Sequence, residues 1–328
     1  MTDTLQSLGE AELLRRLAHF APVGQLDDDT ATLPTQTGPQ LINTDLLVEG
    51  VHFSEGTTSP EDVGWRAAAV NLSDLAASGV DDVVGLTVGL VAPGDTPWEW
   101  VEGVYKGLSA ALEKHGGILL GGDCSGGRQR MLAVTAVGTL GPLRLLRSQA
   151  RPGDQLVVSG PHGLSRLGLG LLLNDPRLKP LSLHEALQEA AIRNHQRPTP
   201  RLDALRTLTA CKPGALPWRA GGTDSSDGLL QALMVMSQAS QCCLRLMHDQ
   251  LPRPNNWPQT PLLDDWCLNG GEDFELVLSL PPSWAQAWLK HQPGSRWIGE
   301  VVNGPAAVVW ADNDTLVETN EGFAHFGG

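Results

Sequence analysis

Several short segments of the chain place acidic or hydroxyl side chains beside a strand end, a helix face or a glycine-rich loop. They are residues 26–30, 43–45, 71–74, 121–127, 224–228 and 270–273. Carboxylate and amide oxygens are the ligands that hard cations such as Mg²⁺ prefer, and glycine-rich loops let main-chain amides approach an anion closely. Together these residue types favour chemistry on phosphate groups that is assisted by divalent cations.

The first two segments each leave two interpretations open. Asp27, Asp28 and Asp29 repel one another, so this run needs either water or cations around it. Asp45 interrupts an apolar strand, where an acidic residue has a low propensity, and a cation bound by its carboxylate and the Thr44 oxygen would account for it. A strand end that reaches water is the alternative.

The next two segments combine a helix face with a glycine-rich turn. Asp74 follows Val70 and Asn71 by helical steps, which predicts either a metal carboxylate or a satisfied structural residue. Residues 121–127 begin with Gly-Gly-Asp after an apolar strand, a context that suits phosphate as well as a plain turn. The segment is neither a P-loop, because no Gly-Lys-Ser/Thr follows, nor a dinucleotide fingerprint.

The last two segments place acidic residues at a helix start and at a strand start. In residues 224–228, Ser226 or Asp227 could cap the following helix, whose positive end could also attract an anion. Capping does not account for Asp224. Residues 270–273 form an acidic, glycine-containing corner before an apolar strand, and a hairpin entrance is the simpler interpretation of it.

Composition excludes several classes of function. The 328 residues include 37 acidic and 23 basic side chains, a net charge of −14 that argues against binding to nucleic acid or to an anionic membrane. The longest apolar runs, such as residues 167–173, are too short to span a bilayer. Five cysteines without a C-x-x-C pair, and no signal peptide, predict a cytoplasmic protein. The histidines lack metal spacing, and no serine, cysteine or histidine arrangement indicates a covalent nucleophile.

Alternating strand and helix patterns predict an α/β fold with two domains, residues 1–142 and 143–328, separated by a turn-rich passage. Strands are expected at 41–48, 83–90, 117–122, 131–140, 155–159, 243–247, 273–280, 297–302 and 306–310. Helices are expected at 10–20, 59–77, 98–114, 163–174, 184–195, 199–210 and from about 227 onward.

The order of these segments resembles the thiamine-monophosphate kinase family, whose relatives include aminoimidazole ribonucleotide synthetase, selenophosphate synthetase and the hydrogenase-maturation dehydratase. The resemblance covers nearly the whole chain. It rests on residues 28–31, 44–53, 70–76, 121–123, 151–154, 226–229 and 270–276, together with Arg147, Phe323, His325 and Phe326. Residues 44–53 are the most particular to this family. The cysteines expected near the start of a selenophosphate synthetase and at the end of the hydrogenase-maturation type are absent from the sequence.

The resemblance implies a two-domain fold of mixed sheets in which the N-terminal domains, which bind ATP and metal, pair their sheets across a homodimer. It implies that ATP and several Mg²⁺ ions support direct in-line phosphorylation of thiamine monophosphate to thiamine diphosphate. By position, the implied metal ligands are Asp29, Asn43, Thr44, Asp45, Asp74, Asp123, Asp224 and Asp227, with Asp28 as a neighbour. The implied ATP contacts are Tyr105, Gly122, Asp123, Arg147 and Ser226, and the implied substrate contacts are His52, Glu272 and Phe323.

Two residues depart from the family pattern. Asp27 stands where the family usually has glycine, and Asn43 where it usually has serine or threonine, although an amide oxygen can still bind a hard cation. Two other functions are compatible with the same acidic framework. One is a related ATP-dependent synthetase, and the other is a nucleotide-binding regulator without turnover.

Overall fold

The structure is a computed structural model that describes residues 3–26, 30, 33, 35 and 38–318. The chain divides into two compact units: Met1–Leu75 with Val80–Leu140, and Ala76–Gly79 with Gly141–Gly328. They are called unit 1 and unit 2 below, and each is described by itself. Among the implied site residues, Asp29 and Phe323 lie outside the described residues, as do Asp27 and Asp28.

Unit 1 is built on a four-stranded mixed sheet. Its strands are β1 (Gln40–Val48), β2 (Val80–Ala92), β3 (Ile118–Gly126) and β4 (Met131–Leu140), in the order β1-β4-β2-β3. β4 pairs antiparallel with β1 and β2, whereas β2 and β3 run parallel. β1 and β3 are therefore the two edges of this sheet.

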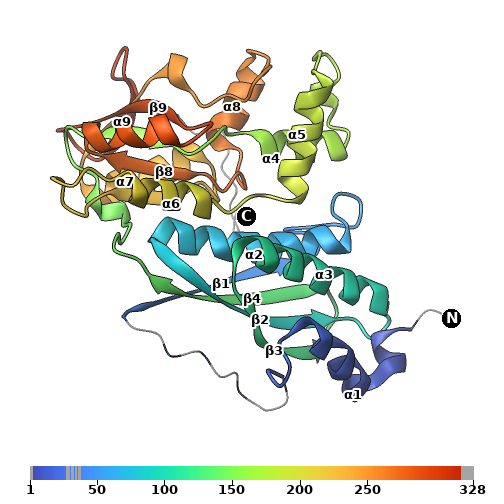
Figure 1. Cartoon of the computed structure of the whole chain (residues 1–328). Helices are drawn as coiled ribbons and strands as arrows, with labels where there is room; N and C mark the ends of the chain where they lie inside the picture. The colour runs from blue at the N-terminus through green and yellow to red at the C-terminus, as the bar shows by residue number, and fades with distance from the viewer. Residues whose placement is uncertain (1–2, 27–29, 31–32, 34, 36–37, 319–328) are drawn as a thin grey trace. The chain divides into compact units, whose positions relative to one another are not determined.

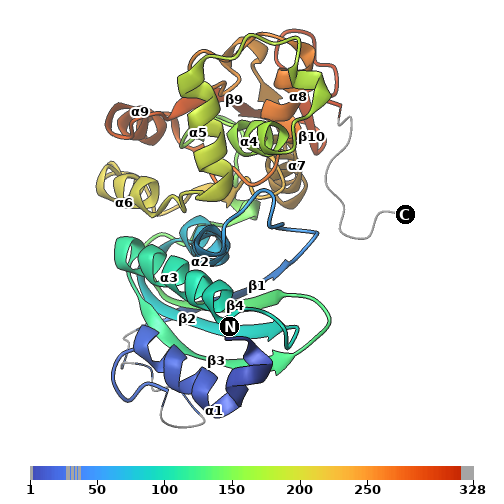
Figure 2. The ribbon, with the colours of Figure 1, turned by 90° about the vertical axis from the view of Figure 1, so that its right-hand side faces the viewer.

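Two long helices, α2 (Pro60–Ser78) and α3 (Trp98–His115), cover one face of this sheet, and α1 (Leu5–Leu17) lies beside β3 (Figures 1 and 2). α2 begins as expected, because the Ser59 hydroxyl accepts a hydrogen bond from the Asp62 amide. α2 and α3 approach so closely that a Cβ at Gly64 would lie 1.8 Å from the Val104 carbonyl oxygen. Glycine at this crossing is what allows the close packing.

Unit 2 contains a six-stranded mixed sheet in the order β10-β7-β9-β5-β8-β6. Its strands are β5 (Gln155–Val158), β6 (Gly221–Asp224), β7 (Cys243–Leu246), β8 (Leu276–Leu280), β9 (Arg296–Val302) and β10 (Ala307–Trp310). Only the β7–β10 pair is parallel. The chain therefore has an α/β fold with two mixed sheets, as the sequence predicts.

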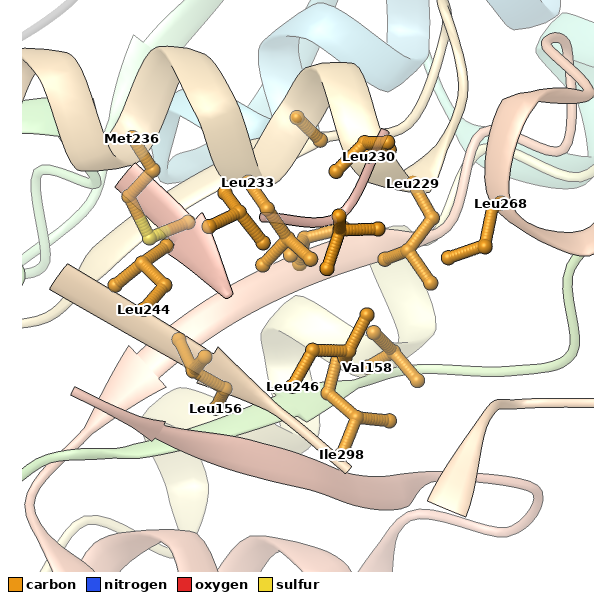
Figure 3. Packing of buried hydrophobic residues seen from close by; sticks show 14 of the residues in the cluster. Leu156, Val158, Leu229, Leu230, Leu233, Met236, Leu244, Leu246, Leu268 and Ile298 are labelled. Atoms are coloured by element: carbon orange, nitrogen blue, oxygen red, sulfur yellow. The ribbon is translucent and has the colours of Figure 1, made fainter. Parts of the chain in front are cut away.

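Helices cover both faces of the second sheet (Figure 2). α7 (Leu229–Ser240) and α8 (Pro261–Asn269) pack on one face, where Leu229, Leu233 and Met236 meet Leu156, Leu244 and Ile298 in the main core (Figure 3). α6 (Leu202–Ala210) and α9 (Pro282–His291) lie on the other face. α4 (Leu164–Leu172) and α5 (Glu185–Gln196) pack on each other and form a smaller core with α8.

Most of the expected elements are present, with differences in a few places. β3 continues to Gly126 and does not end at residue 122, so residues 121–126 belong to an edge strand and the expectation of a glycine-rich turn there is wrong. The sequence analysis did not predict β6, α8 or α9, although Thr260 before Pro261 is a helix-start signal and its hydroxyl does cap α8. β8 begins at Leu276 and not at residue 273, because the preceding residues form an irregular loop. No helix among the described residues is long and apolar enough to cross a membrane.

Candidate functional site

A group of polar side chains in unit 1 lies between β1 and the middle of α2. The Asn43 amide nitrogen is 3.3 Å from Asp45 Oδ2, 3.1 Å from Asn71 Oδ1 and 3.1 Å from Asp74 Oδ2. Asn43 and Asp45 are two residues apart on β1, and Asn71 and Asp74 are three apart on α2, so each pair shares one face of its element. These four residues are called the β1–α2 cluster below.

Asn71 is fully buried, and its orientation is set by its own helix. Its Nδ2 donates to the Ala67 carbonyl oxygen, four residues earlier, at 2.9 Å. This bond leaves the Asn71 Oδ1 directed at the cluster. Asn71 is not among the site residues expected from the sequence, although its helical spacing from Asp74 is a signal that identifies it.

The side-chain amide of Asn43 is only partly satisfied by hydrogen bonds from the described residues. Its Nδ2 carries two hydrogens but meets three oxygens, and its Oδ1 is buried without a hydrogen-bond partner among the described residues. Three oxygens that converge on one point, with a further oxygen unused nearby, form a set that suits a hard cation. The donor set of this cluster therefore fits Mg²⁺.

The surroundings of Asp45 include a second carboxyl group and a histidine. Burial raises the pKa of the Asp45 carboxyl, while hydrogen bonds with Asn43 and Asp74 and the nearby His52 ring oppose that rise. His52 lies on the tight turn after β1, where its Nδ1 accepts a hydrogen bond from the Val48 amide at 3.1 Å. This bond places the proton of the neutral ring on Nε2.

Two implied ligands lie away from this cluster. Thr44 points to the opposite face of β1 from Asp45, and its hydroxyl is 2.7 Å from that of Thr135 on β4. The structure therefore does not bring the Thr44 hydroxyl and the Asp45 carboxylate to one cation. Asp123 lies on β3, the other edge of the sheet. Asp45 and Gly122, the neighbour of Asp123, lie in one cross-strand row of the sheet. They are three strand spacings apart, which is about 14 Å.

The residues around Asp123 belong to β3 and α3. Gly122 and Asp123 are exposed, whereas Tyr105 is 4% exposed and its ring packs on Phe20. Burial raises the pKa of the Tyr105 hydroxyl well above its usual range. A Cβ at Gly122 would lie 2.1 Å from the Val88 carbonyl oxygen, so strand packing already requires this glycine. Nucleotide contacts by these residues stay a prediction.

In unit 2 the structure joins two acidic segments that are almost fifty residues apart in sequence, residues 224–228 and 270–275. Asp224 ends β6 and pairs in register with Leu276, the first residue of β8, so both loops emerge at the same end of the sheet. The Glu272 amide donates to the Ser226 carbonyl oxygen at 2.7 Å, and the Ser225 amide donates to the Glu275 carbonyl oxygen at 3.0 Å. These two segments are called the paired loops below.

The helix after the first loop does not use the acidic residues as caps. α7 has Gly228 as its N-cap, with no side-chain hydrogen bond, so the expectation that Ser226 or Asp227 caps it is wrong. Asp224 is 5% exposed and Asp227 is exposed. Helix capping therefore does not explain why position 227 carries an acidic residue.

Arg147 also belongs to this part of unit 2. It is exposed, and its Nε donates to the Thr223 hydroxyl at 3.1 Å, one residue before Asp224. Thr223 is a buried β6 residue that the sequence analysis missed, because no local pattern connects it with a side chain 76 positions away. The contact orients Arg147 beside the end of β6.

The implied metal ligands are thus divided among separate places. Asn43, Asp45 and Asp74 meet in the β1–α2 cluster, Asp123 lies on the opposite sheet edge, and Asp224 and Asp227 belong to the paired loops of unit 2. Within the part of the chain that the structure describes, no three His, Cys, Asp or Glu side chains gather into a metal-binding group. The cluster reaches four oxygen-bearing residues only because two of them are asparagines.

Comparison with known proteins first defines a fold class. The model of the AIR synthase related protein, N-terminal domain, matches residues 27–140. The solved structure of E. coli HypE, a hydrogenase maturation protein, superposes with a TM-score of 0.72 over 94% of this chain and 97% of that chain, at 18% identity. At that identity the likeness concerns the fold alone, which is that of the AIR synthase related proteins.

Full-length relatives then define the family. The chain is 54% identical to the thiamine-monophosphate kinase of Prochlorococcus marinus, over 99% of this chain and 98% of that protein. It is 42% identical to that of Synechococcus elongatus, over 99% of both. The structure of AaThiL complexed with AMPPCP and TMP matches 99% of this chain and 100% of that chain, with a TM-score of 0.75 and 30% identity. The chain belongs to the thiamine-monophosphate kinase family.

Proposed function

We propose that the chain phosphorylates thiamine monophosphate to thiamine diphosphate, with ATP as the phosphoryl donor. The observation that carries this assignment is the 54% identity to a thiamine-monophosphate kinase along both whole chains. Two features of the described residues support it. One is the oxygen-rich β1–α2 cluster, which fits a hard cation, and the other is the pair of acidic loops beside Arg147 in unit 2.

Magnesium is the cation that we assign to the β1–α2 cluster. Asn43, Asp45, Asn71 and Asp74 would hold it through carboxylate and amide oxygens, which are hard ligands suited to Mg²⁺. Asp29, Asp123, Asp224 and Asp227 stay proposed ligands of further ions. When bound, Mg²⁺ supplies positive charge that screens the phosphate oxygens of two anionic substrates from each other.

We assign the remaining roles to the chain's own side chains. Arg147, held by Thr223 through Nε, keeps its terminal guanidinium donors for phosphate oxygens of ATP. Ser226 is also assigned to nucleotide binding, and so are Gly122, Asp123 and Tyr105 of unit 1, in each case by position in the family pattern. His52 and Glu272 contact thiamine monophosphate, and Phe323 is proposed on the resemblance alone.

The transfer that we propose is direct and in line. An oxygen of the substrate phosphate forms a bond to the γ-phosphorus of ATP while the bond to the β-phosphate oxygen breaks and ADP leaves. Among the described residues near the paired loops, the Ser165 hydroxyl lies 3.2 Å from His195 Nδ1, but both residues are buried, at 1% and 3% exposure. Neither side chain is exposed as a nucleophile, and the sequence contains no nucleophile motif, which favours transfer without a phosphoenzyme.

One assay tests the assignment. Purified protein with ATP, Mg²⁺ and thiamine monophosphate should yield thiamine diphosphate and ADP in equal amounts, measured by chromatography. Folded protein that forms no product would overturn it. Rapid-quench measurement with γ-labelled ATP should show no label on the protein, and a stable phosphoenzyme would exclude direct transfer.

We further propose that a second copy of the chain covers the outer face of β1. β1 is an edge strand, and Ile42 and Leu46 on that face are 73% and 51% exposed. Ile42→Lys with Leu46→Lys should shift a dimer towards the monomer mass in light scattering. The control is Leu173→Lys in unit 2, a leucine that is 61% exposed. A monomeric wild-type protein would contradict the proposal.

The proposed location is the cytoplasm. All five cysteines lie among the described residues and are free thiols. Burial raises the pKa of the Cys124 thiol to about 11 and keeps it protonated at neutral pH. Free thiols of this kind are compatible with a reducing compartment.

A further inference from the structure

The second of the paired loops contains three acidic residues whose surroundings differ. Asp273 is 2% exposed and Glu275 is 9% exposed, whereas the side chain of Glu272 is 34% exposed. Glu275 forms an ion pair with Arg201 and accepts a hydrogen bond from the Ser159 hydroxyl. Of the three carboxylates, that of Glu272 is therefore the one that a ligand can reach.

Asp273 ties the loop to two helices. Its carboxylate accepts hydrogen bonds from the Gly163 amide at 2.6 Å, the Ser165 amide at 2.9 Å and the Asn194 side chain at 3.2 Å. The first two amides belong to the start of α4, so a residue more than a hundred positions away supplies the cap that this helix lacks locally. The third donor is on α5. Asp273 thus fixes the loop at three points.

The residues on either side of Asp273 have an unusual backbone conformation. Glu272 has φ +66° and Phe274 has φ +53°, in the left-handed region that side-chain-bearing residues rarely adopt. Such a conformation persists only where surrounding contacts impose it. The three hydrogen bonds of Asp273 lie between the two strained residues and supply that constraint.

The side chain of Glu272 is also placed by contacts from its neighbours. Its amide is held by the Ser226 carbonyl oxygen, and its Oε2 lies 3.8 Å from Nδ1 of the buried His195. The Ser165 hydroxyl approaches the same ring nitrogen at 3.2 Å. Ser165 and Glu272 both approach Nδ1 of His195, so the ring cannot pass a proton from one of them to the other. The contact between His195 and Glu272 therefore helps to position the Glu272 side chain.

We propose that Asp273 is a positioning residue for thiamine-monophosphate binding, because it holds Glu272 in the left-handed backbone conformation that joins its amide to the first of the paired loops and leaves its carboxylate partly exposed beside His195. The inference rests on the proposed function, which assigns Glu272 to that substrate. Asp273 touches neither substrate. Its loss acts through Glu272 and alters recognition of thiamine monophosphate, not of ATP.

A double-mutant cycle tests this role. Glu272→Gln, Asp273→Asn and the double variant are assayed for the KM of each substrate, for kcat and for Tm. Asp154→Asn is the matched control, since Asp154 is a buried carboxylate of the same unit that accepts bonds from Arg219, Ser279 and the Arg151 amide, away from the paired loops. Asn194→Ala removes one donor to Asp273 and serves as the milder variant if Asp273→Asn folds poorly.

Glu272→Gln and Asp273→Asn should each raise the KM for thiamine monophosphate about tenfold, and the double variant by no more than either alone, because both act through one contact. The KM for ATP should stay within about twofold throughout. Asn194→Ala should raise the KM for thiamine monophosphate about twofold to threefold. Asp154→Asn should lower Tm without changing the ratio of the two KM values.

Three results would overturn the positioning role: an unchanged KM for thiamine monophosphate in both Asp273→Asn and Asn194→Ala, independent effects that multiply in the double variant, or an equal rise in the Asp154→Asn control. A failure of the underlying assignment has a different signature. In that case the wild-type protein does not turn over thiamine monophosphate, or Glu272→Gln leaves its KM unchanged, and the role of Asp273 falls with it.

Discussion

The β1–α2 cluster of unit 1 and the paired loops of unit 2 place acidic side chains by different means. In the cluster, a regular strand and a regular helix set every direction, and none of its four residues has a positive φ. In the paired loops, main-chain hydrogen bonds between distant segments set the directions, and Glu272 and Phe274 are left-handed. Regular elements give a rigid ligand set at little conformational cost, whereas irregular loops need anchors.

This difference predicts how each region responds to substitution. In the cluster, substitutions of the residues that supply the ligand oxygens should have the largest effects. These residues are held in place by main-chain hydrogen bonds of a helix and a strand, which a change of a neighbouring side chain does not remove. In the paired loops, strain costs of order 1–3 kcal/mol for each left-handed residue, so supporting residues should matter almost as much as the residues they support.

The largest effect should come from Asp45→Asn, which removes one of the two carboxylates of the cluster. We expect turnover of thiamine monophosphate to fall about 10²-fold to 10³-fold, because charge stabilisation at the transferring phosphate is lost. Steady-state kinetics measures this. Thr44→Val is the control on the opposite face of β1, and its turnover should stay within about threefold of wild type. Equal losses of turnover in the two variants would contradict the assignment of the cation site to the face of β1 that carries Asp45.

A smaller effect should follow from Asn71→Leu, which keeps the side chain's approximate size but removes both amide contacts. We expect Mn²⁺, used as a probe for Mg²⁺, to bind about 10-fold to 100-fold more weakly in titration calorimetry. Ser73→Ala provides the comparison, since Ser73 is also fully buried on α2 but two residues along, on another face of the helix. Unaltered Mn²⁺ affinity in Asn71→Leu would remove Asn71 from the cation site.

In unit 2, a single hydroxyl tests the support of Arg147. Thr223→Val has nearly the same shape but lacks the group that receives the Arg147 Nε–H, and the KM for ATP should rise about threefold to tenfold for one lost hydrogen bond to a charged group. Thr223→Ser retains the hydroxyl and should restore most of the affinity. Identical KM values for the two variants would mean that Thr223 does not orient Arg147.

The smallest effect concerns stability and pH. Burial raises the pKa of Asp273 from its ordinary value of 3.8 to about 7. Between these two pH values the folded protein therefore keeps a proton on Asp273 that the unfolded chain has released. The stability from this group is complete below pH 3.8 and is lost as pH rises to about 7. Relative to Asp273→Asn, wild-type Tm should therefore fall by a few degrees, about 2–4 °C, between pH 5 and pH 8. A constant difference in Tm would contradict the raised pKa.

The sequence identified the regular elements well where local signals agree. Residues 131–140, rich in β-branched side chains, form β4 with the predicted bounds, and Ser59 with Pro60 begins α2. Asp45 stood out because it interrupts an apolar strand. Strand alternation could also have separated Thr44 from Asp45, since adjacent strand residues face opposite sides. The sequence alone could therefore have excluded Thr44 as a partner of Asp45 at one cation.

Other parts of the site could not be read from any local pattern. The position of Asp123 depends on the strand order, which places β3 at the edge opposite to β1. The contact between Thr223 and Arg147 spans 76 residues. The delayed start of β8 follows from the left-handed residues before it, and these in turn depend on the anchoring of Asp273 to α4 and α5.

The sequence by itself determined the α/β class, most elements, the family and the acidic residue types, because propensity, periodicity and motif order are local properties of the chain. Only the tertiary structure decided which acids meet. Sheet order separated Asp45 from Asp123, the β6–β8 register joined the two loops, and long-range hydrogen bonds fixed Glu272. Distances between side chains depend on how elements pair, and pairing is settled by packing across the whole unit.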